Sequence, residues 1–91
     1  MRIDKFCKLS RIIKRRTEAK KACDEKCVKI NDQFAKAGDP VKPFDKIEIF
    51  FRNRFLFLEV LEIPEGNVSI SRAKELYRII KDEKRDRGSE I

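Results

Sequence analysis

The stretch MRIDKFCKLSRIIKRRTEAKKACDEKCVKINDQFAK, residues 1–36, contains most of what decides the fold and all of the net charge. It carries 12 Lys and Arg residues against 5 Asp and Glu, whereas residues 37–91 carry 11 of each, so the formal net charge of +7 arises here. Apolar residues recur in this stretch at the spacings of helices and a strand, so the basic residues between them are expected to lie on ordered secondary structure. Ordered basic surfaces usually meet phosphate groups, so nucleic acid is the expected partner.

Two short amphipathic helices are predicted in this stretch. The first is expected over residues 4–15 with Asp4 as its N-cap, because a carboxylate there accepts hydrogen bonds from free backbone N–H groups. The second follows a break at residues 15–16 and is expected to begin at a Thr17 cap. Their apolar positions at helical spacing are Phe6, Leu9 and Ile13 in the first, and Ala19, Ala22 and Cys23 in the second.

The remainder of the chain is predicted to form a small sheet and one further helix. Alternation predicts a β-hairpin over residues 28–35 with a turn at Asn31-Asp32, and two more strands over residues 46–51 and 55–63. A last amphipathic helix is expected over residues 71–83, and the mixed-charge tail over residues 84–91 is expected to fray. The expected fold class is therefore α+β, with two N-terminal helices packed on a mostly antiparallel sheet.

An enzyme is not expected. The chain has no histidine, which removes the commonest general base and the usual nitrogen ligand for metals, and it has no glycine-rich phosphate loop. We therefore predict no catalytic residues, no metal site and no cofactor. Three cysteines without an apolar leader indicate reduced thiols, and no apolar stretch is long enough to span a membrane, so we expect a cytoplasmic protein.

Four phenylalanines lie in the two later strands, at positions 50, 51, 55 and 57. Core packing is the favoured interpretation, because a small sheet needs large side chains on its buried face. Adjacent Phe50 and Phe51 must point to opposite faces, so at least one is exposed or covered by the last helix. The alternative is an aromatic platform on which single-stranded bases stack.

An ordered series of motifs along residues 1–51 resembles the RNA-binding domain named after ribosomal protein S-four. The matching positions are Arg2-Ile3-Asp4-Lys5-Phe6, Arg11, Lys14-Arg15-Arg16-Thr17, Ala19, Val28-Lys29-Ile30-Asn31, Val41-Lys42 and Asp45. The segment Ala73–Ile80 is similar to the ending of one subgroup, the short RqcP proteins of bacterial ribosome quality control, relatives of heat-shock protein fifteen. The resemblance implies one domain over residues 1–83, with its core over 1–51 and a C-terminal strand and helix over 55–83.

The resemblance also implies which residues face RNA, and these lie on the basic stretch already selected by charge. They are Arg2, Lys5, Arg11, Lys14, Arg15, Arg16, Lys20 and Lys29. Asp4 is expected to cap or orient rather than to bind phosphate. The family tends to place glycine where this chain has Lys26, Asp32 and Phe44, at turns where a positive φ is convenient, so mild strain or altered loops are expected there.

The implied function is that of a stand-alone adaptor. It would bind rRNA and peptidyl-tRNA on obstructed large ribosomal subunits as a monomer, and support alanine tailing of stalled chains with an RqcH-like factor. Recognition is expected to follow A-form shape and backbone position more than base sequence. Two alternatives remain open: a protein-interaction module whose basic face meets an acidic protein, and a regulator that binds structured RNA off the ribosome.

Overall fold

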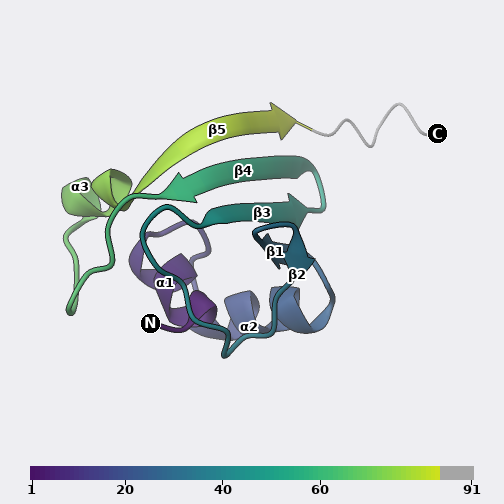
Figure 1. Ribbon diagram of the computed structural model, residues 1–91, viewed down its shortest axis with the longest axis horizontal. Helices are drawn as coiled ribbons and strands as arrows, with labels where there is room; N and C mark the ends of the chain where they lie inside the picture. The colour runs from purple at the N-terminus through teal and green to yellow at the C-terminus, as the bar shows by residue number, and fades with distance from the viewer. Residues whose placement is uncertain (85–91) are drawn as a thin grey trace.

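Two helices, four strands, a short helical segment and a final strand follow one another along the chain (Figure 1). This computed structural model describes residues 1–84. Helices α1 and α2 span Ile3–Leu9 and Arg16–Asp24, and strands β1 to β4 span Val28–Ile30, Gln33–Phe34, Lys46–Phe51 and Arg54–Val60. Helix α3 spans Ile70–Ala73 and continues as the 3₁₀ turn η1, Lys74–Leu76, into β5, Tyr77–Lys84.

The strands form one five-stranded sheet in the order β2-β1-β3-β4-β5, and every neighbouring pair is antiparallel. The α+β prediction is therefore confirmed. Alternate residues of β1, β3 and β4 turn one face inward, where they join Ile3 and Phe6 of α1 and Ala19 of α2 in a single core. Figure 1 shows α1 and α2 beside the β1–β3 half of the sheet and α3 at the far end, next to β4 and β5.

Helix α1 is shorter than predicted, because it ends at Leu9 and not at residue 15. Arg11 adopts the left-handed conformation with φ of 62°, which stops a right-handed helix. The N–H groups of Arg11 and Ile13 then donate to the carbonyls of Lys8 and Cys7, each at 3.1 Å. This turn still brings Ile13 into the core at 6% exposure, so the apolar position was predicted correctly although its helix was not.

The two expected N-caps are also wrong. Helix α1 begins after Arg2 and α2 begins after Arg15, and neither residue caps through its side chain. Asp4 lies inside the first turn of α1, where its Oδ1 accepts from the N–H of Lys5 at 2.7 Å. Thr17 lies inside α2, one residue after the first helical position.

The predicted β-hairpin is confirmed, and its turn is tied to the start of β3. Lys29 and Ile30 of β1 pair with Phe34 and Gln33 of β2. Asn31 donates from Nδ2 to Asp45 Oδ1 at 3.0 Å, and its Oδ1 accepts from the N–H of Lys46 at 2.9 Å. Asp45 is only 5% exposed, and its Oδ2 accepts from the N–H of Lys42 at 2.9 Å, so both oxygens of this buried carboxylate are satisfied. These hydrogen bonds give a structural role to Asn31 and Asp45, two positions of the family motif.

The C-terminal helix expected over residues 71–83 is not formed. After the short α3 and η1, residues 77–84 are extended and pair with β4, from Val60 with Tyr77 to Arg54 with Lys84. Strand β4 itself stops at Val60 and not at residue 63, because the N–H groups of Leu61 and Glu62 turn to the carbonyl of Leu76. Pairing with the free edge of β4 overrode a spacing that fits a helix, as tertiary contacts often do. Of the predicted tail, Lys84 ends β5 and residues 85–91 lie outside the described residues.

Core packing of the phenylalanines is confirmed for Phe51 alone. Ile47 and Ile49 of β3 and Leu56 and Leu58 of β4 fill the buried face at 2% exposure or less. Because side chains alternate along a strand, the phenylalanines at positions 50, 55 and 57 lie on the opposite face, where each is partly exposed. Phe51 packs against the core from the end of β3.

Backbone strain occurs at all three turns where a family glycine is missing. Lys26, Asp32 and Phe44 have φ of 59°, 72° and 74°, in the left-handed region that costs an L-residue about 1–2 kcal/mol. The expected strain is therefore confirmed. Phe44 stands out because its large side chain is 72% exposed and so returns little burial energy.

We predict that Phe44→Gly raises the free energy of unfolding by about 1 kcal/mol. Glycine removes a strain of about 1–2 kcal/mol and loses roughly half of that gain through the extra entropy of its unfolded chain. The backbone hydrogen bond from Phe44 N–H to the carbonyl of Val60, 2.7 Å, needs no side chain. Urea denaturation measures the change. Phe34→Gly, at an exposed strand position without a positive φ, is the control and should be destabilising.

Candidate nucleic-acid interface

Cations of the N-terminal third are mostly unpaired, whereas those of the sheet are mostly neutralised. In the sheet, Lys46 and Arg78 both contact Glu59, at 3.3 and 2.9 Å, and Arg54 pairs with Asp82 at 2.8 Å. The hydrogen bond from Arg78 is the main reason why the pKa of Glu59 lies below its usual value. Within residues 1–84, six predicted RNA-facing residues form no ion pair: Lys5, Arg11, Lys14, Arg15, Lys20 and Lys29. Unpaired surface cations create the positive potential that attracts phosphate.

The remaining two predicted residues, Arg2 and Arg16, meet on Asp4, and we call these three residues the Asp4 cluster. Arg2 donates to both carboxylate oxygens of Asp4, at 3.2 and 3.1 Å, and Arg16 Nε lies 3.4 Å from Oδ2. Asp4 is 2% exposed, whereas the side chains of Arg2 and Arg16 are 52% and 46% exposed. The buried carboxylate thus holds two guanidinium groups at the surface, and each guanidinium has further N–H donors beyond those used by Asp4.

Lys20 lies beside the Asp4 cluster. It lines, together with Thr17 and the three cluster residues, a hollow of about 300 Å³ at the junction of α1 and α2. Arg15 precedes α2 and is exposed next to Arg16. The charge therefore lies at the N-terminal ends of two helices that contact each other.

The eight predicted residues do not form one continuous group. Arg11 and Lys14 line a separate hollow at the end of α1, which shares no residue with the one beside the Asp4 cluster. Lys29 points to the outer face of β1, opposite the inward Val28, with its Nζ 4.9 Å from the ring centre of Phe34 and 5.9 Å from that of Phe50. These distances permit cation–π attraction.

Sequence reasoning missed Lys8, which lines the second hollow together with Arg11 and Lys14. Its spacing of three residues from Arg11, which suits one face of the helix predicted over residues 4–15, was the available signal. Asn67 on the loop before α3 lines the same hollow, and nothing local marks that residue as part of a site.

The described residues offer no cluster of metal ligands, and two of the cysteines, Cys7 and Cys23, are buried. Among residues 1–84 no group of three or more His, Cys, Asp or Glu side chains could hold a metal ion. Burial raises the pKa of the Cys7 thiol, and burial together with the negative charge of Asp4 raises that of Cys23 to about 11. Both thiols are thus overwhelmingly protonated at neutral pH and behave as small apolar side chains. No helix within these residues is long and apolar enough to cross a membrane.

Comparison with known proteins places this arrangement in a family. Residues 1–47 match the model of the S4 domain. The chain is 40% identical over 84 residues to the RQC P-site tRNA stabilizing factor of Bacillus subtilis. The aligned residues cover 92% of this chain and 96% of that protein. It is 42% identical over 82 residues to the protein of the same name from Streptococcus pneumoniae, covering 90% and 92% of the two chains.

The fold has a solved counterpart. Heat shock protein 15 of Vibrio cholerae, whose structure is trimeric, superposes with a TM-score of 0.79 over 87% of this chain and 80% of its own, at 24% identity. The similarity to this neighbour shows a shared fold. The matches to the bacterial factors cover nearly the whole length of both chains at about 40% identity. On this evidence the chain belongs to the family of S4-domain RQC P-site tRNA stabilizing factors.

Proposed function

We propose that this protein is an RNA-binding adaptor of bacterial ribosome quality control, which binds rRNA and P-site peptidyl-tRNA on obstructed large ribosomal subunits. The observation that carries the proposal is the identity of about 40% to P-site tRNA stabilizing factors along almost the entire length of both chains. The unpaired cations on residues 1–47 support it, because they supply positive charge that can neutralise the phosphates of an RNA backbone.

The chemistry of the site favours recognition of backbone shape. Arg2 and Arg16 are preoriented by Asp4, so each can offer a rigid fork of donors to phosphate oxygens with little further loss of side-chain entropy. Arg15 and Lys20 add charge at the same helix junction. The second group of cations, at the end of α1, would let one small domain contact a second segment of RNA. A protein that grips rRNA and tRNA together would hold the tRNA in its site.

The finer features of the proposal concern partners and assembly. We propose that the protein acts as a monomer through a single domain over residues 1–83, and that it works in the cytoplasm. Its role would be to keep the peptidyl-tRNA in place while an RqcH-like factor extends the stalled chain with alanine. The chain itself would perform no catalysis and would need no cofactor, since its contribution is binding and positioning.

The test is sucrose-gradient sedimentation of the tagged protein from lysates with stalled ribosomes, followed by sequencing of the bound RNA. We expect comigration with large subunits that carry tRNA, and release after nuclease treatment. Retention of a protein partner after RNA digestion would instead support the interaction module. Recovery of messenger leaders or other free structured RNA, without large subunits, would support the regulator.

A further inference from the structure

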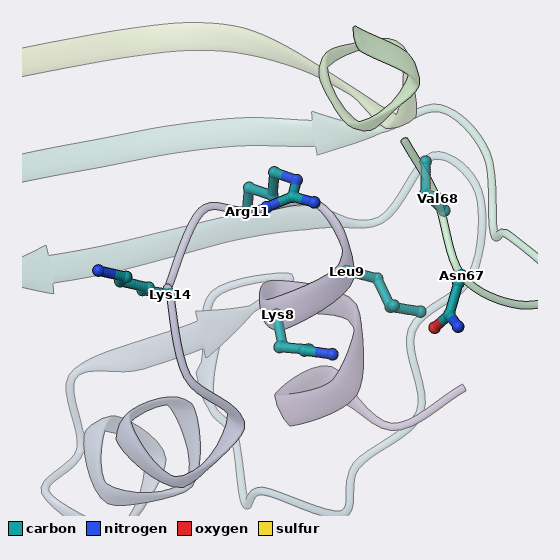
Figure 2. A pocket seen from close by; sticks show the side chains of 6 residues that line it. All are labelled: Lys8, Leu9, Arg11, Lys14, Asn67 and Val68. Carbon is teal, nitrogen blue, oxygen red and sulfur yellow. The ribbon is translucent and has the colours of Figure 1, made fainter. Parts of the chain in front are cut away.

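A hollow of about 560 Å³ lies between the end of α1 and the loop that precedes α3, and we call it the α1 hollow. Figure 2 shows Leu9 and Asn67 projecting toward each other across it, with Arg11 on the turn above Leu9. The lining residues are Lys8, Leu9, Arg11, Lys14, Asn67 and Val68. Its size falls in the range typical of small-molecule sites, roughly 300–1,000 Å³.

The lining combines three kinds of chemistry. Lys8, Arg11 and Lys14 are exposed and form no ion pair within residues 1–84, and no carboxylate lines the hollow. Leu9 and Val68 contribute an aliphatic wall, and the Asn67 amide can both donate and accept hydrogen bonds. These are the groups with which a protein binds a nucleotide: cations contact the phosphates, an apolar wall packs against the base ring, and an amide bonds to the polar edge of the base.

The turn after α1 directs Arg11 to this place. The residue is held in the left-handed region, φ 62°, while its N–H donates to the carbonyl of Lys8 at 3.1 Å and the following Ile13 is buried. Helix, turn and core anchor therefore set the starting direction of the Arg11 side chain before any ligand arrives. Its planar guanidinium can stack on a base as well as pair with phosphate.

We propose that the α1 hollow binds one unpaired nucleotide of the RNA to which the protein is bound. Lys8 and Lys14 would meet the flanking phosphates, the base would lie between the Arg11 guanidinium and the wall of Leu9 and Val68, and Asn67 would bond to the base edge. The inference rests on the proposed RNA-binding function and adds to it a preference for an extruded base. This preference would give the adaptor a means to recognise a bulge or loop in addition to backbone shape.

The experiment compares two RNA hairpins that differ in one residue, a single-nucleotide bulge of 2-aminopurine that is absent from the fully paired partner. Wild type should bind the bulged hairpin about tenfold more tightly at 0.15 M salt, because stacking of one base on the protein adds to the phosphate contacts that both hairpins offer. The 2-aminopurine fluorescence should change on binding. Arg11→Gly and Asn67→Ala should both abolish the tenfold preference.

Lys26→Gly is the matched control. Like Arg11→Gly it removes one exposed cation and places glycine at a positive φ, 59° against 62°, but Lys26 does not line the hollow. It should keep the preference for the bulged hairpin. Equal affinity of wild type for the two hairpins, or equal behaviour of Arg11→Gly and Lys26→Gly, would overturn the nucleotide site alone. Failure of wild type to bind either RNA would overturn the proposed function as well.

Discussion

The Arg15→Ala/Lys20→Ala variant is expected to bind large ribosomal subunits about 30-fold more weakly at 0.1 M salt, while its free energy of unfolding stays unchanged. Both side chains are exposed and form no ion pair within residues 1–84, so their charge is available to phosphate and their loss disturbs no contact in the core. Each lost phosphate contact should reduce the slope of log K against log salt by about 0.7–0.9. Filter binding or sedimentation over a range of salt concentrations measures both quantities.

A charge-matched variant separates a local interface from general attraction. Arg52→Ala/Lys74→Ala also removes two exposed cations without ion pairs in the described part of the chain, but at positions outside both hollows of the basic stretch. It should retain affinity within about twofold and keep the salt slope, apart from a small effect of net charge. Equal losses from the two variants would show that binding follows total charge and that residues 15–20 form no specific contact.

The Arg2→Ala/Arg16→Ala variant is expected to lose about 3 kcal/mol of stability, a shift of more than a hundredfold in the folding equilibrium. These two side chains are the ion-pair partners of the buried Asp4 within residues 1–84, and a buried carboxylate without a cation is strongly destabilising. Arg2→Ala or Arg16→Ala alone should cost less, because the other guanidinium remains within 3.4 Å. Urea denaturation and the melting temperature measure the loss.

Adding Asp4→Asn to that double variant should recover at least half of the lost stability. The neutral amide needs no counter-charge, and its oxygen can still accept from the N–H of Lys5, the bond that Asp4 now makes at 2.7 Å. Absence of rescue would mean that Arg2 and Arg16 stabilise the fold by packing of their aliphatic stems. The three-residue variant, folded but without both guanidinium groups, is also the proper probe of their contribution to RNA binding.

The regular spacing of residues 1–36 predicted most of the buried helical positions, although Ala22 is only partly buried and the buried Ile3 was not predicted. Phe6 of α1 and Ala19 and Cys23 of α2 are in the core, as their period of three and four implies. Strand β3 was also predicted with the correct bounds, and the hairpin around Asn31 to within one residue, since alternation and turn residues are local signals. Positive φ at Lys26 and Phe44 followed from comparison with the family pattern.

The C-terminal prediction failed because one pattern suits two structures. Ala73, Leu76, Tyr77 and Ile80 are spaced as on a helix, yet Ile79 and Ile80 are β-branched and equally fit a strand. The edge of β4 was available for pairing, and it decided the outcome. The same limit applies to the phenylalanines, because alternation separates two faces of a strand without saying which one the helices cover.

Local composition and periodicity therefore suffice for the α+β class, the basic first third and most of the buried positions that were predicted for α1 and α2, because these depend on neighbours a few residues apart. The family was predicted from the resemblance of its ordered motifs. The strand after residue 76, the pairing of Asp4 with Arg16 and the placement of Arg11 and Asn67 around one hollow were decided by the tertiary structure. Each depends on groups that folding brings together from separate parts of the chain, and their contact energies outweigh local propensities worth a fraction of a kcal/mol per residue.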